Sequence, residues 1–246
     1  MEVALAPEII GHIGGFKISN AIAATVLVDA TLVSLVFFVN KSLKKVPGRL
    51  QSIFEQLISY FYETTEQIAG KFTKSIFPWF ASFFIFIFAT NVIGLLPGFG
   101  SIGFFEVHDG HEVFVPLLRA GTSDFNTTLA LACVSLVATH ALAIKYNGLF
   151  GYLKKFFSLN PILLFVGLLE LVSEATKVIS LSFRLFGNIY AGEVVIHTIH
   201  GLFGYIAPIP FLLLESIVAF VQALVFAMLT IVFMTILVNP HEEGAH

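Results

Sequence analysis

Apolar runs long enough to cross a lipid bilayer follow one another along the chain and indicate its architecture. A transmembrane helix needs about 20 predominantly apolar residues, and runs of that length cover residues 20–39, 76–96 and 125–144. Two longer runs cover 161–200 and 207–239. The pattern predicts an all-α integral membrane protein with about five membrane crossings, in which residues 1–246 form a single membrane domain.

The segment 48–71 has a different pattern, because its apolar and polar residues lie on opposite sides of a helix. Such a pattern is typical of an amphipathic helix that lies in the membrane interface or packs against a neighbour. A helix that simply faces solvent on its polar side fits equally well. The apolar positions are Ile53, Phe54, Leu57, Ile58 and Phe61, and the polar ones include Gln51, Glu55, Ser59, Glu63 and Glu66.

The run 161–200 is too long for a helix perpendicular to the membrane. Forty helical residues span about 60 Å, roughly twice the hydrocarbon thickness. No proline follows Pro161 within the run, and two short spans would put 201–210 on the wrong side. We therefore expect one strongly tilted helix. The run 207–239 is expected to return beside it as a second long, tilted helix, so that the two form a hairpin.

Positive charge predicts the orientation, since cytoplasmic loops are enriched in lysine and arginine. The loop 98–124 is acidic and contains a single cation, Arg119. The turn 201–210 carries no charge, and the other connections are rich in lysine, which predicts a periplasmic N-terminus and a cytoplasmic C-terminus. The basic residues are Lys41, Lys44, Lys45 and Arg49 after the first span, Lys71 and Lys74 before the second, and Lys145, Lys154 and Lys155 after the third.

Composition narrows the classes of function. The chain is 57% hydrophobic and only 12% charged, which is typical of membrane proteins and not of soluble domains. Its net charge of −3 and the lack of a basic arm argue against nucleic-acid binding. The sequence contains no phosphate-binding loop, HExxH or paired CxxC motif. We therefore expect no cofactor and no metal, and no catalytic chemistry in this chain alone.

Arg184 is the most informative residue of the sequence, because it lies in a long apolar stretch with no acidic residue within one helical turn. A guanidinium stays protonated at physiological pH, and burying it at the centre of a bilayer costs at least about 3 kcal/mol. Such a charge indicates an ion path or a counter-ion for the carboxylate of a partner.

The helical projection of 161–200 groups its polar residues into two faces. Within about 40° of Arg184 lie Glu170, Ser173, Lys177, Ser180 and Asn188. The opposite face holds the second group, Glu193, His197 and His200. Glu215 and Gln222 share one face of the last helix, and the predicted hairpin brings Glu215 toward Glu193. Acids and histidines together predict a hydrated proton relay on the outer side.

Structural interpretations remain open for several of these residues. Lys177 could form an ion pair with Glu170 or Glu174, and Glu193 and Glu215 could form a hydrogen-bonded pair that holds the hairpin.

Structural interpretations are also open for three more polar residues, and two acids have no assigned role. His197 and His200 could line a wet interface without carrying protons. Asn91, at bilayer depth in the second span, could act as an interhelical clamp. Asp29 in the first span receives no assigned role, and neither does Glu174.

Four sequence segments resemble one known family. The segment SLSFRLFGNIYAGE at 180–193 resembles the signature of subunit a of F-type ATP synthases. QALVF at 222–226, followed by Leu229 and Thr230, is similar to the last helix of that family. NVIGLLP at 91–97 and DFNTTLA at 124–130 look like its middle hairpin. The resemblance covers nearly the whole chain.

The resemblance implies a stationary, proton-translocating subunit in the membrane sector of ATP synthase. Its partners would be the ring of c subunits, the peripheral-stalk b subunits, the rest of the complex and the lipid bilayer. Its location would be a bacterial inner membrane, with the mitochondrial inner membrane as the alternative. Whether the chain carries H⁺ or Na⁺ stays open.

The resemblance also implies roles for individual residues. Arg184 would be the essential arginine that faces the ring carboxylates, with Asn188 and Gln222 close to it. Glu193 and Glu215 would belong to the outer half-channel. The inner half-channel would contain Glu170, Ser173 and Lys177.

The physics of a buried guanidinium agrees with this role. Arg184 would favour the ionised form of a ring carboxylate, and it would interrupt a continuous proton wire because it keeps its own proton. The alternative is a proton-coupled secondary transporter that binds an anionic solute at Arg184. That class predicts inverted repeats or broken helices, and the sequence shows neither.

Overall fold

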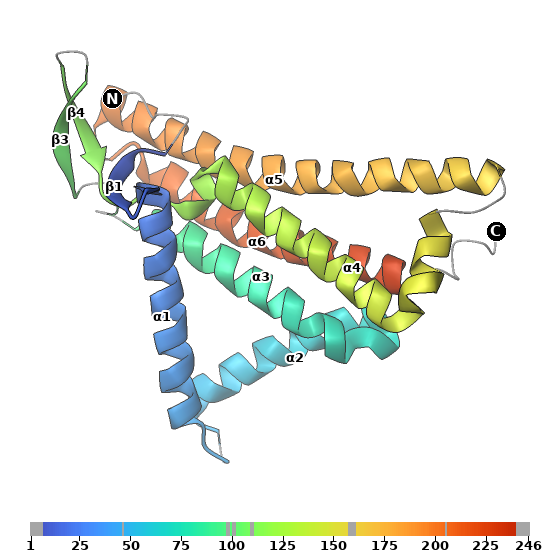
Figure 1. Cartoon of the computed structure of the whole chain (residues 1–246). Coiled ribbons are helices and arrows are strands. Elements are labelled where there is room, and N and C mark those ends of the chain that lie inside the picture. Colours follow the sequence, from blue (N-terminus) through green and yellow to red (C-terminus); the bar gives the residue numbers. More distant parts are fainter. Residues whose placement is uncertain are drawn as a thin grey trace. The chain divides into compact units, whose positions relative to one another are not determined.

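The computed structural model describes residues 7–45, 47–96, 99, 102–108, 111–156, 161–204 and 206–239. In this part of the chain, long helices dominate and two short hairpins precede and interrupt them (Figure 1). The helices are α1 (Asn20–Ser42), α2 (Arg49–Ala69), η1 (Gly70–Phe72), α3 (Thr73–Gly94), η2 (Gly121–Ser123), α4 (Phe125–Phe156), α5 (Pro161–Phe203) and α6 (Ile209–Val238).

Four of the described helical segments are long and apolar enough to cross a membrane: Asn20–Lys41, Gln51–Gly94, Phe125–Leu153 and Ile209–Val238. The prediction of an all-α membrane protein is therefore confirmed. The helix α5 is not among these four segments. Charged residues interrupt its apolar sequence, namely Glu170, Glu174, Lys177, Arg184 and Glu193. It is one unbroken helix of 43 residues, which confirms the predicted continuity of the run 161–200.

The amphipathic segment forms α2, as the helical spacing of its apolar residues predicted. Gly70, with a φ of 51°, ends this helix, and η1 connects it to α3. Phe61 packs against Phe80 of α3 with 5.3 Å between the ring centroids. The side chains of Ile53 and Phe54 remain exposed. The helix thus keeps an apolar surface that suits a lipid interface.

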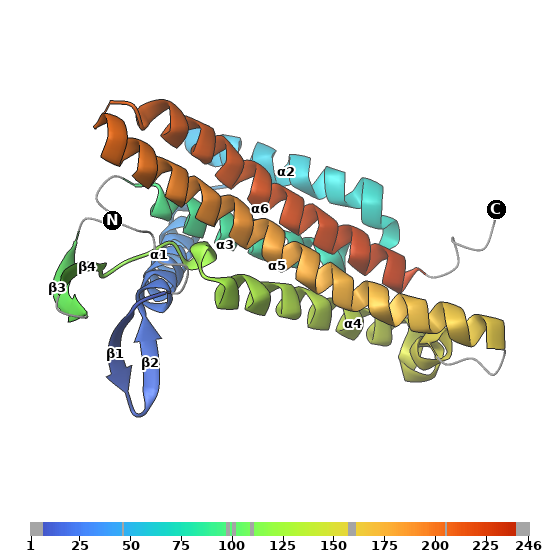
Figure 2. The same cartoon turned by 90° about the horizontal axis from the view of Figure 1, so that it is seen from above.

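The structure adds two hairpins and a longer fourth helix that the sequence analysis did not predict. β1 (Ile9–Ile13) pairs with β2 (Phe16–Ser19) directly before α1 (Figure 2). The second hairpin pairs β3 (Gly103–His108) with β4 (His111–Pro116). The helix α4 continues to Phe156 beyond the predicted end at 144, with a kink at Gly148, where φ is 71°.

The helices are divided between two compact units. Unit 1 contains Met1–Leu43, Phe84–Thr128 and Arg184–Leu224. Its core includes Phe84 and Phe88, whose rings each meet the ring of Phe220 edge-on. Gly121 fits closely against Thr25 and Thr90, because a Cβ at this position would overlap with the side chain of Thr25.

Unit 2 contains Lys44–Phe83, Leu129–Phe183 and Val225–His246. A hydrogen bond of 2.9 Å joins the hydroxyls of Ser135 in α4 and Thr230 in α6. Phe83 packs on Phe226 with 5.5 Å between the ring centroids. Hydroxyl pairs and aromatic contacts of this kind connect helices where lipid provides no hydrophobic driving force between them.

Candidate functional site

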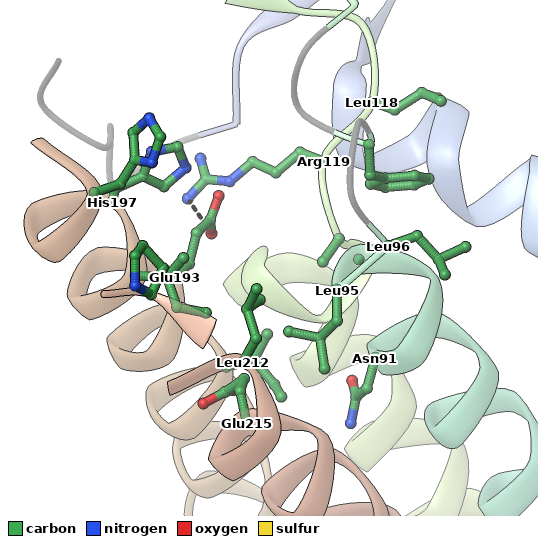
Figure 3. Close-up of a pocket in the computed structure, with 16 residues that line it drawn as sticks. Asn91, Leu95, Leu96, Leu118, Arg119, Glu193, His197, Leu212 and Glu215 are labelled. Carbon is green, nitrogen blue, oxygen red and sulfur yellow. Dashed lines mark hydrogen bonds and ion pairs between the residues drawn. The ribbon is translucent and has the colours of Figure 1, made fainter. Parts of the chain in front are cut away.

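Unit 1 encloses a cavity of about 480 Å³ that contains most of the polar residues expected on the outer side (Figure 3). Its walls come from the end of α3, the segment before α4, the second half of α5 and the beginning of α6. A cavity of this size holds several water molecules. The polar residues in its lining are Asn91, Arg119, Glu193, His197, His200 and Glu215.

Glu193 is held by a cation from a distant loop. Nη2 of Arg119 lies 3.4 Å from Oε2 of Glu193, and Figure 3 shows the two side chains pointing toward each other. Arg119 is only 6% exposed. Its Nε donates to the Ser123 hydroxyl at 3.0 Å, and its guanidinium lies 5.9 Å from the ring of Tyr190. Arg119 is therefore a fixed counter-ion at the wall of the cavity.

Sequence reasoning missed this role of Arg119. It identified the residue only as the single cation of an acidic loop. That isolation was the available signal, because one arginine among acids in a membrane protein is a candidate counter-ion for a carboxylate elsewhere.

Glu215 projects from α6 onto the backbone of α5. It is 8% exposed, and its Oε1 has no hydrogen-bond partner in the described part of the chain. A Cβ built on Gly192 would overlap with the carboxylate of Glu215. Gly192 is therefore the residue that lets the Glu215 carboxylate approach α5.

Glu193 is paired with Arg119, and within the described residues no hydrogen bond joins it to Glu215. The two carboxylates nevertheless line the same cavity, together with His197 and His200. Both histidine side chains are exposed. The sequence interpretation brought these four residues together on one side, and the structure has all four in the lining of one cavity.

Asn91 joins three elements of unit 1. Its amide donates to the carbonyl of Ala219 in α6 at 3.3 Å, and its Oδ1 accepts from the Thr122 hydroxyl in η2 at 2.6 Å. The side chain is 2% exposed. These hydrogen bonds are those of an interhelical residue, and they also fix the end of α3 at the cavity.

Arg184 and Asn188 lie one turn apart on the same face of α5, and both side chains are exposed. Neither residue lines the cavity of unit 1. The Asn188 amide donates to Oε1 of Gln222 at 2.7 Å, and Gln222 is 5% exposed. This bond connects α5 to α6 directly beside the turn that carries Arg184.

The earlier half of α5 carries a second polar cluster, in unit 2. Nζ of Lys177 lies 2.7 Å from Oε1 of Glu174, one turn away on the same helix. Of the two acids considered as partners for Lys177, the structure has the ion pair with Glu174. Nε2 of His140 lies 4.0 Å from Oε2 of Glu174, and the Tyr152 hydroxyl bonds Nδ1 of His140 at 2.8 Å.

The other expected residues of this half of α5 are more open to the surroundings. Ser173 and Ser180 are exposed, and Glu170 is partly exposed. Sequence reasoning did not identify His140 or Tyr152. The signal for His140 was a titratable side chain inside the third apolar run.

The described residues contain no group of three or more histidine, cysteine, aspartate or glutamate side chains able to hold a metal ion. The polar side chains of the two clusters include carboxylates, imidazoles and the cations Arg119 and Lys177. Such groups bind water and exchange protons.

Comparison with known proteins supports the resemblance seen in the sequence. Residues 21–235 match the family model described as ATP synthase A chain. The chain is 36% identical over 230 residues to ATP synthase subunit a of Geotalea uraniireducens, covering 92% of this chain and 89% of that protein. It is 29% identical to ATP synthase subunit a of Moorella thermoacetica, covering 96% and 98% of the two chains.

The length of these matches leaves only short ends of the chain outside them. Together with the four apolar helices, they identify a multi-pass protein of a bacterial membrane that works with the rest of an ATP synthase. The chain therefore belongs to the ATP synthase subunit a family and is a stator subunit of the membrane sector of an F-type ATP synthase.

Proposed function

We propose that the chain supplies two offset half-channels through which protons reach and leave a rotating ring of c subunits, with Arg184 as the gate between them. One observation carries this proposal. Along the unbroken helix α5, the exposed Arg184 follows the Glu174–Lys177 pair and precedes the cavity residue Glu193. A single helix thus supplies residues to two polar clusters and carries a permanent positive charge between them in sequence.

The outer half-channel is the cavity of unit 1. Glu193 and Glu215 accept and release protons, and water in the cavity connects them to the outside through His197 and His200. Arg119 fixes the position of the Glu193 carboxylate at the wall of the cavity. The buried carboxyl of Glu215 then receives protons from the hydrated part of the cavity.

The gate consists of Arg184 with Asn188 and Gln222 beside it. The hydrogen bond between Asn188 and Gln222 fixes this stretch of α5 against α6, so that Arg184 projects from a rigid helix. A guanidinium in a low-dielectric interface favours an ionised carboxylate on the rotor, and it does not release its own proton. Protons therefore pass only as the rotor turns.

The inner half-channel uses the first half of α5, with Glu170, Ser173 and Lys177 on the face followed by Arg184. This half lies toward the cytoplasm, with the N-terminus periplasmic and the C-terminus cytoplasmic, an orientation that the lysine-rich loops support. The peripheral-stalk b subunits hold the chain stationary while the c ring rotates against α5.

The test is ATP-driven acidification of inverted membrane vesicles that contain the whole ATP synthase. We expect Arg184→Ala to abolish acidification, because a neutral gate no longer discharges the rotor carboxylate. Arg184→Lys fails as well, since an ammonium lacks the planar fork and loses its proton more readily when desolvated. Normal acidification in either variant contradicts the proposal.

Two controls accompany this test. The amount of membrane-bound ATPase activity reports assembly of the complex. Lys41→Ala removes another exposed cation, at the end of α1, and should leave acidification unchanged. Loss of pumping in this control as well would assign the effect to general loss of charge.

A further inference from the structure

The best-buried carboxylate of α5 belongs to a residue without an assigned role. Glu174 is 6% exposed, and its Oε2 has no hydrogen-bond partner within the described residues. Its other oxygen, Oε1, accepts from Lys177 at 2.7 Å. A buried carboxylate oxygen without a donor is destabilised unless it gains a proton or a water molecule.

A proton donor faces this oxygen from α4. Nε2 of His140 lies 4.0 Å from Oε2 of Glu174, which is too far for a direct hydrogen bond but within reach of a small side-chain rotation or one bridging water. The other ring nitrogen, Nδ1, bonds the Tyr152 hydroxyl at 2.8 Å. When that hydroxyl donates, the ring proton is on Nε2, the nitrogen that faces Glu174.

The cluster is suited to proton transfer because it leads from a partly exposed group to a buried one. Tyr152 and His140 are partly exposed, whereas Glu174 is buried. Glu174 also lines a cavity of about 10 Å³ with Ser135 and Thr139, at the lower size limit for one water molecule. This small volume favours proton transfer along side chains at this point.

We infer that Glu174 is the proton-exchanging carboxyl group of the inner path and that His140 and Tyr152 carry protons to and from it. This inference rests on the proposed function. At this position, protons pass along a short series of side chains and not through an open channel. The ion pair with Lys177 holds Oε1 of Glu174 and leaves Oε2 toward His140.

The transfer balances without any further reactant. A hydronium ion gives a proton to the Tyr152 oxygen as the hydroxyl proton moves to Nδ1 of His140, which forms an imidazolium. Its Nε2 proton then moves to Oε2 of Glu174 and leaves a neutral imidazole and a carboxylic acid. A flip of the ring returns the protonated nitrogen to the Glu174 side. The reverse sequence releases a proton.

The competing explanation is that Glu174 only neutralises Lys177. The two explanations differ for variants that keep the shape of the site. Glu174→Gln keeps the size and an acceptor for Lys177 but cannot carry a proton. The double variant Glu174→Gln/Lys177→Gln removes both charges, so recovery of pumping in this variant would mean that Glu174 only neutralises Lys177. Glu174→Asp keeps the carboxyl group.

The experiment measures ATP-driven acidification in inverted vesicles carrying the whole complex. We expect Glu174→Gln and the double variant both to pump at least about tenfold more slowly than wild type, whereas Glu174→Asp retains most of the rate. Recovery of pumping in the double variant, or a normal rate in Glu174→Gln, overturns the inference.

His140 provides an independent readout that does not depend on how Glu174 variants fold. In His140→Ala, added imidazole should restore a large part of the lost pumping, relative to wild type at the same imidazole concentration, by supplying the missing proton carrier. Absence of this rescue, with the complex assembled as judged by membrane-bound ATPase activity, contradicts the role of His140.

Arg184→Ala in the same vesicles separates the proposed function from the role of Glu174. If Arg184→Ala pumps normally, the proposed function itself fails. If Arg184→Ala is inactive while Glu174→Gln and His140→Ala pump like wild type, the gate stands and only the role of Glu174 is rejected.

Discussion

The carboxylates of the two units are held in different ways. Glu193 of unit 1 pairs with Arg119, which is 74 residues away in the sequence, at the wall of a cavity of about 480 Å³. Glu174 of unit 2 pairs with Lys177, one turn away on its own helix, beside a cavity of about 10 Å³. The side chain of Glu193 is 25% exposed, whereas that of Glu174 is 7% exposed.

In the proposed account, this difference determines how a proton reaches each acid. Water molecules in the larger cavity would deliver protons directly to Glu193. The small cavity beside Glu174 is at the lower size limit for one water molecule, so the proposed path to Glu174 runs through neighbouring side chains such as His140. Both acids belong to α5, so one helix lines a large cavity and a small one.

The largest expected effect is a difference in water access between the two cavities. In a Cys133→Ser background, Leu212→Cys lines the larger cavity and Leu181→Cys lines the smaller one. A water-soluble, thiolate-directed reagent should modify the first at least about 100-fold faster, because only a hydrated thiol ionises readily. The labelling rates are measured by mass spectrometry of the intact complex. Equal rates for the two cysteines would mean that water reaches both cavities equally well.

The fit of Glu215 against α5 gives the next effect. Gly192→Ala puts a Cβ where the Glu215 carboxylate lies, and overpacking of this kind destabilises by about 1–3 kcal/mol. We expect a lower thermal midpoint of the solubilised complex and strongly reduced pumping. Gly201→Ala is the matched control, because its Cβ meets no atom within 4 Å. If both variants have the same thermal midpoint and pumping rate, the Glu215 side chain moves away from α5 with little loss of stability.

A smaller effect is expected from the counter-ion of Glu193. Arg119→Gln removes the cation, and a double-mutant cycle with Glu193→Gln should give a coupling free energy of about 1–2 kcal/mol. The value is lower than for a fully buried pair because the side chain of Glu193 is partly exposed. Chemical denaturation of the complex in detergent measures it. Additive effects of the two substitutions would show that the pair is not coupled.

The hydrogen bond between the helices of unit 2 should matter least. Ser135→Ala removes the contact with Thr230, and interhelical bonds of this kind contribute about 0.6 kcal/mol in membrane proteins. We expect a small drop in the thermal midpoint and nearly normal pumping. A loss of pumping comparable to that of Glu174→Gln would instead make Ser135 part of the inner path.

The sequence predicted those features that depend on short-range periodicity. The length of α5, the amphipathic pattern of α2 and the common side of Glu193, His197 and Glu215 follow from helical spacing and from the return of α6. The resemblance to subunit a rested on four segments, of which the one around Arg184 is the most specific, and the comparisons with known proteins confirm the family.

The sequence did not predict the contacts that depend on how distant segments pack. The pairing of Arg119 with Glu193 joins a loop to a helix, and the approach of His140 to Glu174 joins α4 to α5. The periodicity of apolar residues within one helix does not indicate which side chain of a distant segment will contact it. The extension of α4 past Gly148 was missed for a local reason, because a glycine with positive φ permits a kink followed by a further helical turn.

The most direct test of the gate is the passive proton conductance of vesicles from which the catalytic sector has been removed. This conductance is compared between vesicles with Arg184→Ala and vesicles with Arg184→Ala/Glu193→Gln. If Arg184 separates the two proton paths, Arg184→Ala should conduct protons passively without coupled rotation, and the added Glu193→Gln should reduce that conductance because it removes a carrier from the outer path. A conductance that Glu193→Gln leaves unchanged, or the absence of any in Arg184→Ala, would contradict the account.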